Sequence, residues 1–330
     1  MKTKTILSGM RPTGKLHLGH LVGALNNWTK LQDEYNCFFM VADWHALMSE
    51  YENPSNIKKN SIEIVKDWVA CGIDPEESVI FVQSMVPEHL ELAMVFSFLT
   101  PLGWLERCTT YKEQLRELEG RMLATYGFLG YPVLQAADIA LYKADAVPVG
   151  GDQLPHLELA REIIRKFHGL YKKEVFKEPA PILTKVSKLV GLDNRKMSKS
   201  YGNFISLSDE KDVVKKKVYS MYTDPNRVRA DVPGKVEGNP VFIYHDIFNP
   251  NKSEVEDLKE RYQKGKVGDI EVKEKLTVAL NNFLDPIREK RGKITDKDAS
   301  NILKHGALRA RETAKRTIAE VKHCLHQIID

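Results

Sequence analysis

Two histidines lie one helical turn apart near the N-terminus, in the segment MRPTGKLHLGH (residues 10–20). The segment follows a predicted strand, and a helix is expected to begin at about His17 to Gly19. Free N–H groups at a helix start, with glycines that allow close approach, form an anion site. His17 and His20 point to the same side and can donate hydrogen bonds to phosphate oxygens. Taken alone, the pattern also fits an ordinary turn with two surface histidines.

A second chemistry-bearing segment, RKMSKS, occupies residues 195–200. Lys196 and Lys199 flank Ser198 in a loop that has Gly191 before it and Gly202 after it. Two ammonium groups on a glycine-bounded loop suit a clamp on a di- or triphosphate. Taken alone, this pattern also fits a solvated basic loop.

The elements that must position these segments alternate in type along the N-terminal half. Short apolar runs predict strands and periodic runs predict helices. The expected strands are Thr5–Met10, Cys37–Ala42 and Ser78–Gln83, and the expected helices are Leu21–Glu34, Asn56–Cys71 and Pro87–Leu99. This β-α-β-α-β order predicts a parallel sheet with right-handed crossovers, an α/β fold of the Rossmann type. Ligands on such sheets bind beyond the carboxyl ends of the strands, where MRPTGKLHLGH begins.

The second half of the chain has a different character. Residues 105–142 are expected to be mostly helical, followed by a strand at Ala146–Val149 and a helix from Gln153 to Leu170. After about residue 205 the strand patterns fade into charged helix, interrupted by an irregular stretch at residues 223–240. We therefore expect a catalytic α/β domain over residues 1–204 and an α-helical domain over residues 205–330.

The last predicted helix has one apolar stripe and several basic faces. Ile318, Val321, Leu325 and Ile328 form the stripe, at a spacing typical of a packed helix face. The basic side chains are Lys304, Arg309, Arg311, Lys315, Arg316 and Lys322. They predict either a solvated surface or a surface that faces a polyanion.

Composition limits the class of protein. Of the 330 residues, 42% are apolar and 28% charged, which is typical of a globular protein with a real core. No apolar run approaches the ~20 residues that span a bilayer, and the N-terminus lacks a secretory or transit signal, so we expect a cytoplasmic protein without membrane contact. The net charge of +4 neither requires nor excludes a polyanionic partner. The four cysteines are scattered without a CxxC pair, so neither zinc nor an iron–sulfur cluster is expected.

The order HLGH then KMSKS on an α/β chain is the paired signature of class I aminoacyl-tRNA synthetases. Over nearly its whole length the sequence resembles the tryptophanyl-tRNA synthetases. The matching stretches are SGMRPTGKLHLGHLVGAL, ADWHAL, FVQSMVPEH, YPVLQAADIALYKADAVPVGGDQLPHLELARE and RKMSKSYGN. The resemblance implies tryptophan activation by ATP with Mg²⁺, then transfer to tRNA, whose anticodon the helical domain reads. It also implies a homodimer, with an interface from the inserted helices around Pro101–Thr125.

The resemblance assigns roles residue by residue. His17 and His20 match histidines that bind ATP and stabilise the α-phosphate in the transition state, and together with Lys196 and Lys199 they are the expected catalytic groups. The expected ATP-binding set is Arg11, Pro12, Thr13, Gly19, His20, Gly150, Gly151, Asp152, Val186, Lys196, Met197, Ser198, Lys199 and Ser200. Asp138 matches the carboxylate that accepts the indole N–H, with Tyr131, Gln135 and Gln153 around the amino acid.

The chemistry of the substrate agrees with the role given to Asp138. The tryptophan side chain has one polar atom, a donor, so recognition needs one acceptor in an apolar slot. Small neighbours, Ala136 and Ala137, leave room for a large ring. The alternative for Asp138 is a helix residue bonded to backbone. For His45, in ADWHAL, packing and site support are equally expected.

Three alternatives to this reading remain open from the sequence. The tyrosyl-tRNA synthetases share the fold, but they place a Tyr near the end of the first strand, where this chain has Leu7, which cannot pair with a phenol. A non-catalytic synthetase-like paralogue would have lost signature residues that are intact here. Another nucleotidylyltransferase would also use HxGH but would lack the long helical half. Some tryptophanyl relatives hold an iron–sulfur cluster, but residues 239–274 contain no cysteine.

Overall fold

A parallel sheet forms the centre of the molecule in the computed structural model, which describes residues 2–108, 125–183, 189–199, 201–224, 227 and 229–327. Its strands lie in the order β3-β2-β1-β4-β5, and each neighbouring pair is parallel. Their bounds are β1 Thr5–Met10, β2 Asn36–Val41, β3 Ser78–Val82, β4 Ala146–Val149 and β5 Ala180–Leu183. The Rossmann-type α/β fold predicted from the sequence is therefore confirmed.

Four of the five strands lie where the apolar runs predict them, and the edge strand β5 was not predicted. β2 and β3 are apolar along nearly their whole length because both of their faces are covered. β5 has the sequence APIL and is half exposed, and Pro181 removes one backbone donor. Such a strand carries little periodic signal, and proline is tolerated in it because it lies at an edge.

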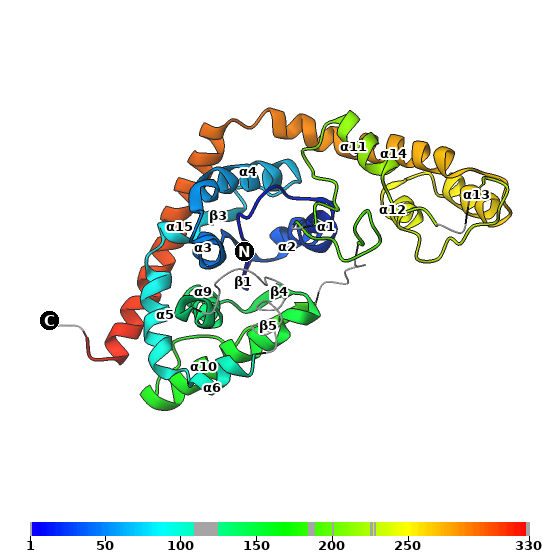
Figure 1. The fold of residues 1–330 in the computed structure, drawn as a ribbon. Coiled ribbons are helices and arrows are strands. Elements are labelled where there is room, and N and C mark those ends of the chain that lie inside the picture. The colour runs from blue at the N-terminus through cyan, green and yellow to red at the C-terminus, as the bar shows by residue number, and fades with distance from the viewer. Residues whose placement is uncertain are drawn as a thin grey trace.

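Helices cover the sheet and continue beyond it (Figure 1). In the α/β part they are α1 Leu18–His20, a π-helical turn Leu21–Leu25, α2 Asn26–Glu34, α3 Asp43–Glu50, α4 Ile57–Ala70, α5 Glu88–Leu99, α6 Leu102–Glu106, α8 Tyr126–Leu129, α9 Tyr131–Leu141 and α10 Leu154–Tyr171. Short 3₁₀ turns occupy Pro54–Asn56, Gln83–Met85 and Gly151–Gln153. The later helices are α11 Lys211–Tyr219, α12 Pro240–Phe248, α13 Lys252–Gln263, α14 Asp269–Gly292 and α15 Asp296–Cys324.

Two helix predictions needed correction. The first helix begins at Leu18 rather than Leu21, because His17 caps it: the backbone N–H of His17 donates to Nδ1 of His20 at 3.2 Å. α3 was not predicted; it starts directly after β2, where sequence periodicity is short. Between residues 105 and 142 the described helices are the end of α6, α8 and α9, and residues 109–124 lie outside the described part of the chain.

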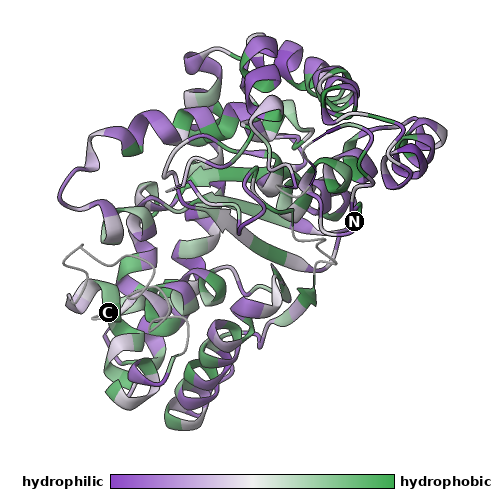
Figure 2. Cartoon of the chain, turned by 45° about the vertical axis from the view of Figure 1, so that its right-hand side comes forward, coloured by the Kyte–Doolittle hydropathy of each residue, from purple (hydrophilic) through white to green (hydrophobic). Residues whose placement is uncertain are grey.

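The core lies on both faces of the sheet, as the green strands in Figure 2 indicate. On one face Trp28 stacks on Phe39, with ring centroids 4.5 Å apart, and meets Trp68 edge-on. On the other face Phe96, Phe167 and further apolar residues pack under α9 and α10. Aromatic packing of this kind fixes the strands whose ends carry the site.

The helical part of the chain does not form a wholly separate body. In Figure 1 α12 and α13 form a lobe at the right, α14 runs back from that lobe, and α15 descends along the far edge of the sheet. α15 packs against the edge strand β3 and against α4 and α5. It thereby covers the unpaired backbone that an edge strand would otherwise expose. The described residues contain no strand after β5.

The predicted apolar stripe of α15 is confirmed for Ile318 and Val321, which are buried against the α/β part, whereas Ile328 lies outside the described residues. Two members of its basic set make internal contacts. Arg311 donates to Glu88 of α5 at 2.9 Å, and Arg309 donates to the carbonyl of Pro75 at 3.1 Å. For these two arginines the simple picture of a solvated face is wrong.

Other expectations concern membranes and metals. None of the helices described here has the length and apolar character to cross a membrane. The cysteines are not joined in disulfides, and no three His, Cys, Asp or Glu side chains come together as a metal site within the described residues.

The closest approach between α15 and β3 generates a prediction. A Cβ on Gly306 would lie 1.8 Å from the carbonyl oxygen of Ile80, which is backbone and cannot turn away. Gly306→Ala should therefore lower the free energy of unfolding by about 1–3 kcal/mol, as overpacking does. Gly169→Ala in α10 is the matched control, because nothing lies within 4 Å of its Cβ position. Urea unfolding of both variants checks this; equal stabilities would contradict the packing.

Candidate active site

The sheet reverses its strand order between β1 and β4, and a cavity of about 340 Å³ opens at the carboxyl ends of these strands. β1 contributes Leu7, Ser8 and Gly9 to its wall, and β4 contributes Val147 to Val149. Ligands of open α/β sheets bind at such a reversal, because the two loops that follow diverge there and leave room. The volume suits a small organic ligand.

The cavity brings together the four residues assigned to tryptophan. Tyr131, Gln135 and Asp138 come from α9, and Gln153 lies just before α10. Three turns of one buried helix therefore aim three polar groups at one place. The rest of the wall is mostly apolar: Leu7, Met40, Ala42, Met48, Phe128, Ile139, Val147, Pro148 and Val149.

Asp138 is the most strongly engaged group of the cavity, with 2% of its surface exposed. Its Oδ2 accepts from Nε2 of His45 at 2.7 Å, and its Oδ1 accepts from Nδ1 of His89 at 2.6 Å and Nε2 of Gln83 at 2.8 Å. Burial raises the pKa of Asp138, but hydrogen bonds and charge from His45 and His89 outweigh burial and lower it to about 2. The group is thus an ionised acceptor at neutral pH.

The proton positions around Asp138 follow from this ionisation. A carboxylate only accepts, so Nδ1 of His89 must carry a proton. The other ring nitrogen of His89 lies 2.8 Å from the hydroxyl of Tyr142. Burial, with the charges of Asp138 and Glu88, raises the pKa of Tyr142, so the phenol keeps its proton and donates it to His89. The chain Tyr142–His89–Asp138 therefore points its donors inward to the carboxylate.

Sequence reasoning missed His89 and Gln83, and it left His45 undecided. His45 contributes to the site, through its bond to Asp138 and its place in the cavity wall. Gln83 and His89 lie in FVQSMVPEH, directly after the buried strand β3. Their position after a parallel strand was the available signal, since such segments meet at the ligand-binding edge.

A second hydrogen-bond network, also missed from the sequence, supports Tyr131 and Gln153. The hydroxyl of Tyr131 lies 2.6 Å from Nε2 of His156, and Nδ1 of His156 lies 3.0 Å from Oε1 of Gln153. Burial, together with His45, lowers the pKa of His156 to about 4, so the ring is neutral and one nitrogen donates while the other accepts. His156 therefore fixes two cavity residues by one ring.

The two signature histidines are not surface groups. His17 is 8% exposed, and its ring centroid lies 3.8 Å from that of His20. Burial and the nearby Lys199 lower the pKa of His17 to about 4, and burial, His17 and Lys199 lower the pKa of His20 well below its ordinary value. Both imidazoles are neutral at pH 7, so each can donate one hydrogen bond without adding charge.

The HLGH and KMSKS segments are adjacent in space, although they are far apart in sequence. Residues 16–18 pair with residues 205–207: His17 and Ser206 form an antiparallel bridge, and the N–H of Leu18 donates to the carbonyl of Ile205 at 3.0 Å. Asn203 then shapes the loop before this pairing. Its side chain accepts from the N–H of Ser198 at 2.8 Å and donates to the carbonyl of Lys196 at 3.1 Å.

Gly19 allows this close approach. A Cβ at Gly19 would lie 2.9 Å from Sδ of Met197 and 3.0 Å from the ring of His17. The glycine is needed because the two segments pack directly on one another there. The loop is therefore held over the start of α1, where the N–H groups of a helix face an anion.

Lys199 reaches from this loop to the segment before His17. Its ammonium donates to the carbonyl of Gly14 at 3.2 Å and lies 3.5 Å from Oγ1 of Thr13. Burial and the positive charge of Arg11 lower the pKa of Lys199 to about 8, with Asp67 acting in the opposite direction. Cationic groups crowded in this way favour an anionic ligand that would relieve their repulsion.

The remaining predicted ATP residues surround these two features. Arg11 lines the cavity, and the carbonyl of Pro12 accepts from Asn60 at 3.0 Å. Gly150, Gly151 and Asp152 follow β4 beside the cavity, and a Cβ on Gly150 would lie 2.6 Å from Oδ1 of Asp152. Lys196 lies exposed at the loop tip. Val186 and Ser200 lie outside the described residues.

Comparison with known proteins agrees with this geometry. Residues 2–285 match the family model described as tRNA synthetases class I (W and Y). Fold and site together therefore define a class I aminoacyl-tRNA synthetase. The Tryptophan–tRNA ligase of Thermotoga maritima is 50% identical over 325 residues, covering 97% of this chain and 98% of the relative. That of Borreliella burgdorferi is 48% identical over 328 residues, covering 98% and 93%. The chain belongs to the tryptophan–tRNA ligases of this family.

Solved structures extend the agreement to the fold. Tryptophanyl-tRNA synthetase from Campylobacter jejuni, complexed with ADP and tryptophan, has a TM-score of 0.89 at 33% identity, covering 98% of this chain and 99% of that one. A tyrosyl-tRNA synthetase from Archaeoglobus fulgidus has a TM-score of 0.65 at 24% identity, covering 88% and 91%, so it shares the fold.

The position of Lys199 generates a prediction about activation of tryptophan. Lys199→Ala should lower kcat at least ~10²-fold, as the loss of a preorganised donor does, while the KM for tryptophan changes much less. In the wild type, kcat/KM for ATP should fall as pH rises through about 8, because the free enzyme loses the Lys199 proton there.

Lys199→Arg is the control, because a guanidinium does not titrate in this range. Its residual activity should lack the decline near pH 8. Pyrophosphate exchange measured across pH for the three proteins decides. An effect confined to KM, or an unchanged alkaline limb in Lys199→Arg, would contradict the role of this lysine.

Proposed function

We propose that the cavity between β1 and β4 is where this tryptophan–tRNA ligase activates L-tryptophan. The amino-acid carboxylate attacks the α-phosphorus of ATP, the P–O bond to pyrophosphate breaks, and tryptophanyl-adenylate forms. The terminal ribose of tRNA, through its 2′-hydroxyl, then attacks the adenylate carbonyl and releases AMP. The single observation that carries this proposal is the ionised Asp138 in an otherwise apolar wall.

Asp138 has one acceptor position to spare in the direction that matters. Its Oδ1 already accepts from His89 and Gln83, whereas Oδ2 accepts from His45 alone. A carboxylate oxygen accepts two hydrogen bonds comfortably, so Oδ2 can take the indole N–H. A charge-assisted bond of this kind is stronger than a neutral one, and phenylalanine could not make it. Leu7, which lines the same cavity, offers a tyrosine hydroxyl no partner.

The phosphate chemistry needs alignment more than proton transfer. The tryptophan carboxylate is already a nucleophile at neutral pH, so no general base is required. His17 and His20 donate neutral hydrogen bonds at the α-phosphate, and Lys196 and Lys199 neutralise the charge that grows on the departing pyrophosphate. The mutual contact of HLGH and KMSKS supports this division, because it places both sets at one helix start.

We assign Mg²⁺ to the substrate rather than to the protein. The described residues contain no group of three metal-ligating side chains, and the loops around the phosphate region are cationic. The ion would therefore arrive on ATP, held mainly by phosphate oxygens and water, as Mg²⁺ prefers. It would share the neutralisation of phosphate charge with the lysines.

The tRNA would be read by the helical part of the chain. We propose residues 205–330 as the anticodon-binding region, supported by the lobe of α12 and α13, which extends away from the sheet (Figure 1). α15 also braces the sheet, so the region would be tethered to the catalytic part. A ligase that charges tRNA is proposed to work in the cytoplasm, where its tRNA is used.

A homodimer is proposed from the surface of α5. Leu90, Met94 and Phe98 are 41%, 55% and 75% exposed and repeat every four residues, so they form one apolar row on the helix. Leu102, at 62% exposure, continues this row towards the proposed interface at Pro101–Thr125, of which residues 109–124 lie outside the description. A contiguous apolar surface of this kind is typical of a protein contact, and a second copy would bury it about a two-fold axis.

The role of Asp138 is tested by amino-acid-dependent pyrophosphate exchange. Asp138→Ala should reduce kcat/KM for tryptophan roughly 10- to 10³-fold, since a charge-assisted bond and an orphaned buried donor each cost about 1.5–3 kcal/mol. Discrimination against phenylalanine should fall with it.

Leu7→Tyr is the companion variant, measured with all three aromatic amino acids. It should reduce tryptophan use by crowding the slot and admit traces of tyrosine. A wild type that prefers tyrosine would overturn the substrate, and an Asp138→Ala enzyme that uses tryptophan normally would overturn only the role of Asp138.

The apolar row of α5 is tested by sedimentation. Phe98→Asp should convert the dimer to a monomer, because a charge would be buried without a partner at the interface. Ile270→Asp on α14 is the matched control, since Ile270 is 71% exposed and lies in the helical part. If both variants sediment as the wild type does, the row is not the interface.

A further inference from the structure

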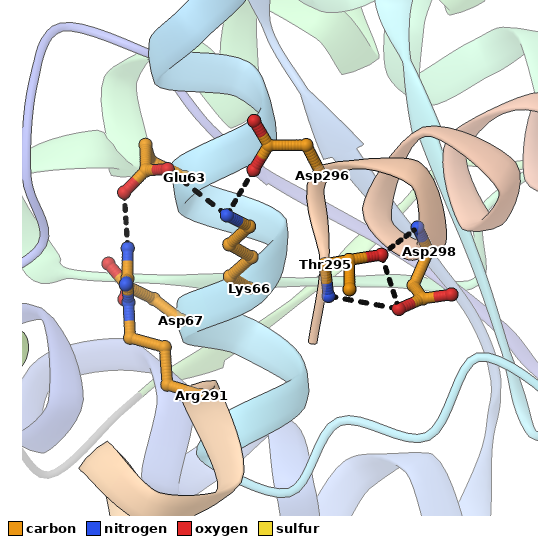
Figure 3. Close-up of polar contacts among 7 residues, drawn as sticks. All are labelled: Glu63, Lys66, Asp67, Arg291, Thr295, Asp296 and Asp298. Atoms are coloured by element: carbon orange, nitrogen blue, oxygen red, sulfur yellow. Dashed lines mark hydrogen bonds and ion pairs between the residues drawn. The ribbon is translucent and has the colours of Figure 1, made fainter. Parts of the chain in front are cut away.

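A cluster of charged side chains joins α4 of the α/β part to the corner between α14 and α15 (Figure 3). Arg291, in the last turn of α14, donates from Nε to Oδ1 of Asp67 at 2.6 Å and from Nη2 to Glu63. Lys66 of α4 contacts Asp296 at the start of α15 and lies 3.5 Å from Glu63. Asp67 differs from the other members, because it is 1% exposed.

The buried carboxylate of Asp67 also faces the signature segment. It accepts a backbone hydrogen bond from Leu16, the residue before His17. The carbonyl of Leu16, on the other side of the same residue, accepts from the N–H of Leu207 at 3.0 Å. Leu16 is therefore fixed at both polar groups, by Asp67 and by the strand-like segment that follows the KMSKS loop.

The charge of Asp67 reaches the phosphate clamp as well. It acts to raise the pKa of Lys199, against burial and the charge of Arg11. The other titratable groups that face Asp67 are Arg291, Glu63 and Cys71. Burial raises the pKa of Asp67 itself, and Arg291 is the cation that opposes this. Without Arg291 the ionised form would be left buried and unpaired, which is costly.

We propose that Asp67 is a positioning residue for activation: it holds Leu16, and with it His17, in register while Arg291 ties this hold to the placement of α14. The inference rests on the proposed function of His17 and Lys199. It goes further, because it makes the geometry of the ATP site depend on an ion pair with the helical region. A shift of α14 would withdraw Arg291, loosen Asp67 and release the backbone in front of the first histidine.

The test compares Asp67→Asn with Glu63→Gln, two isosteric changes one helical turn apart on α4. Both remove a carboxylate partner of Arg291, but only Asp67 reaches Leu16. Asp67→Asn should lower kcat for tryptophan-dependent pyrophosphate exchange roughly tenfold with little change in tryptophan KM. It should also move the alkaline limb of kcat/KM for ATP to lower pH, because Lys199 loses an anion that favours its charged form. Glu63→Gln should leave both close to wild type.

A second measurement does not depend on activity. In Arg291→Gln, amide hydrogen exchange of residues 16–18 should be faster than in the wild type, whereas Lys293→Gln, which removes an exposed α14 ion pair with Glu289, should not change it. This arm also decides if Asp67→Asn fails to fold. Equal kinetic losses in Asp67→Asn and Glu63→Gln without a shifted limb, or unchanged exchange in Arg291→Gln, would reduce the cluster to an ordinary tether. A wild type without tryptophan-dependent exchange would instead overturn the proposed function.

Discussion

The antiparallel pairing of residues 16–18 with residues 205–207 is the contact on which the rest of the site depends. It is short, but it joins the start of α1 to the end of the loop that carries Lys196 and Lys199. Backbone hydrogen bonds of this kind fix register as well as distance. The neutral state of both histidines and the lowered pKa of Lys199 follow from the same contact, because it buries all three groups together. A site assembled in this way is preorganised for phosphate before any ligand arrives.

Amino-acid selection rests on a different constraint, the cost of an ion in an apolar wall. Asp138 remains ionised because three donors surround it, each from a different part of the chain: His45 of α3, Gln83 after β3 and His89 of α5. Tyr142 extends the network behind His89. A buried network of this kind is costly when any member is missing, so it specifies one arrangement of the surrounding helices. The substrate is then recognised by completing the acceptor pattern of one oxygen.

The helical part contributes to the α/β part in two places. α15 covers the edge strand, with Gly306 set against the backbone of Ile80, and Arg311 of the same helix pairs with Glu88, the residue before His89. Arg291 of α14 meets Asp67 behind the first signature segment. Both the amino-acid site and the phosphate site thus have a supporting residue one step away that contacts a helix from beyond residue 205. The division at residues 204 and 205 is one of sequence character, while the packing crosses it.

The sequence by itself determined the strand–helix order, the Rossmann-type class and the identity of the two signatures, because apolar periodicity and local motifs are properties of neighbouring residues. β1 and β4 begin and end as their apolar runs predict, and Tyr131, Gln135 and Asp138 lie together because one helix carries them. Only the tertiary structure decided the ionisation of Asp138, the contact of Gly19 with Met197, the place of α15 and the ion pair of Arg291 with Asp67. Each of these joins segments far apart in the chain, and a buried charge takes its meaning from the groups that surround it in space.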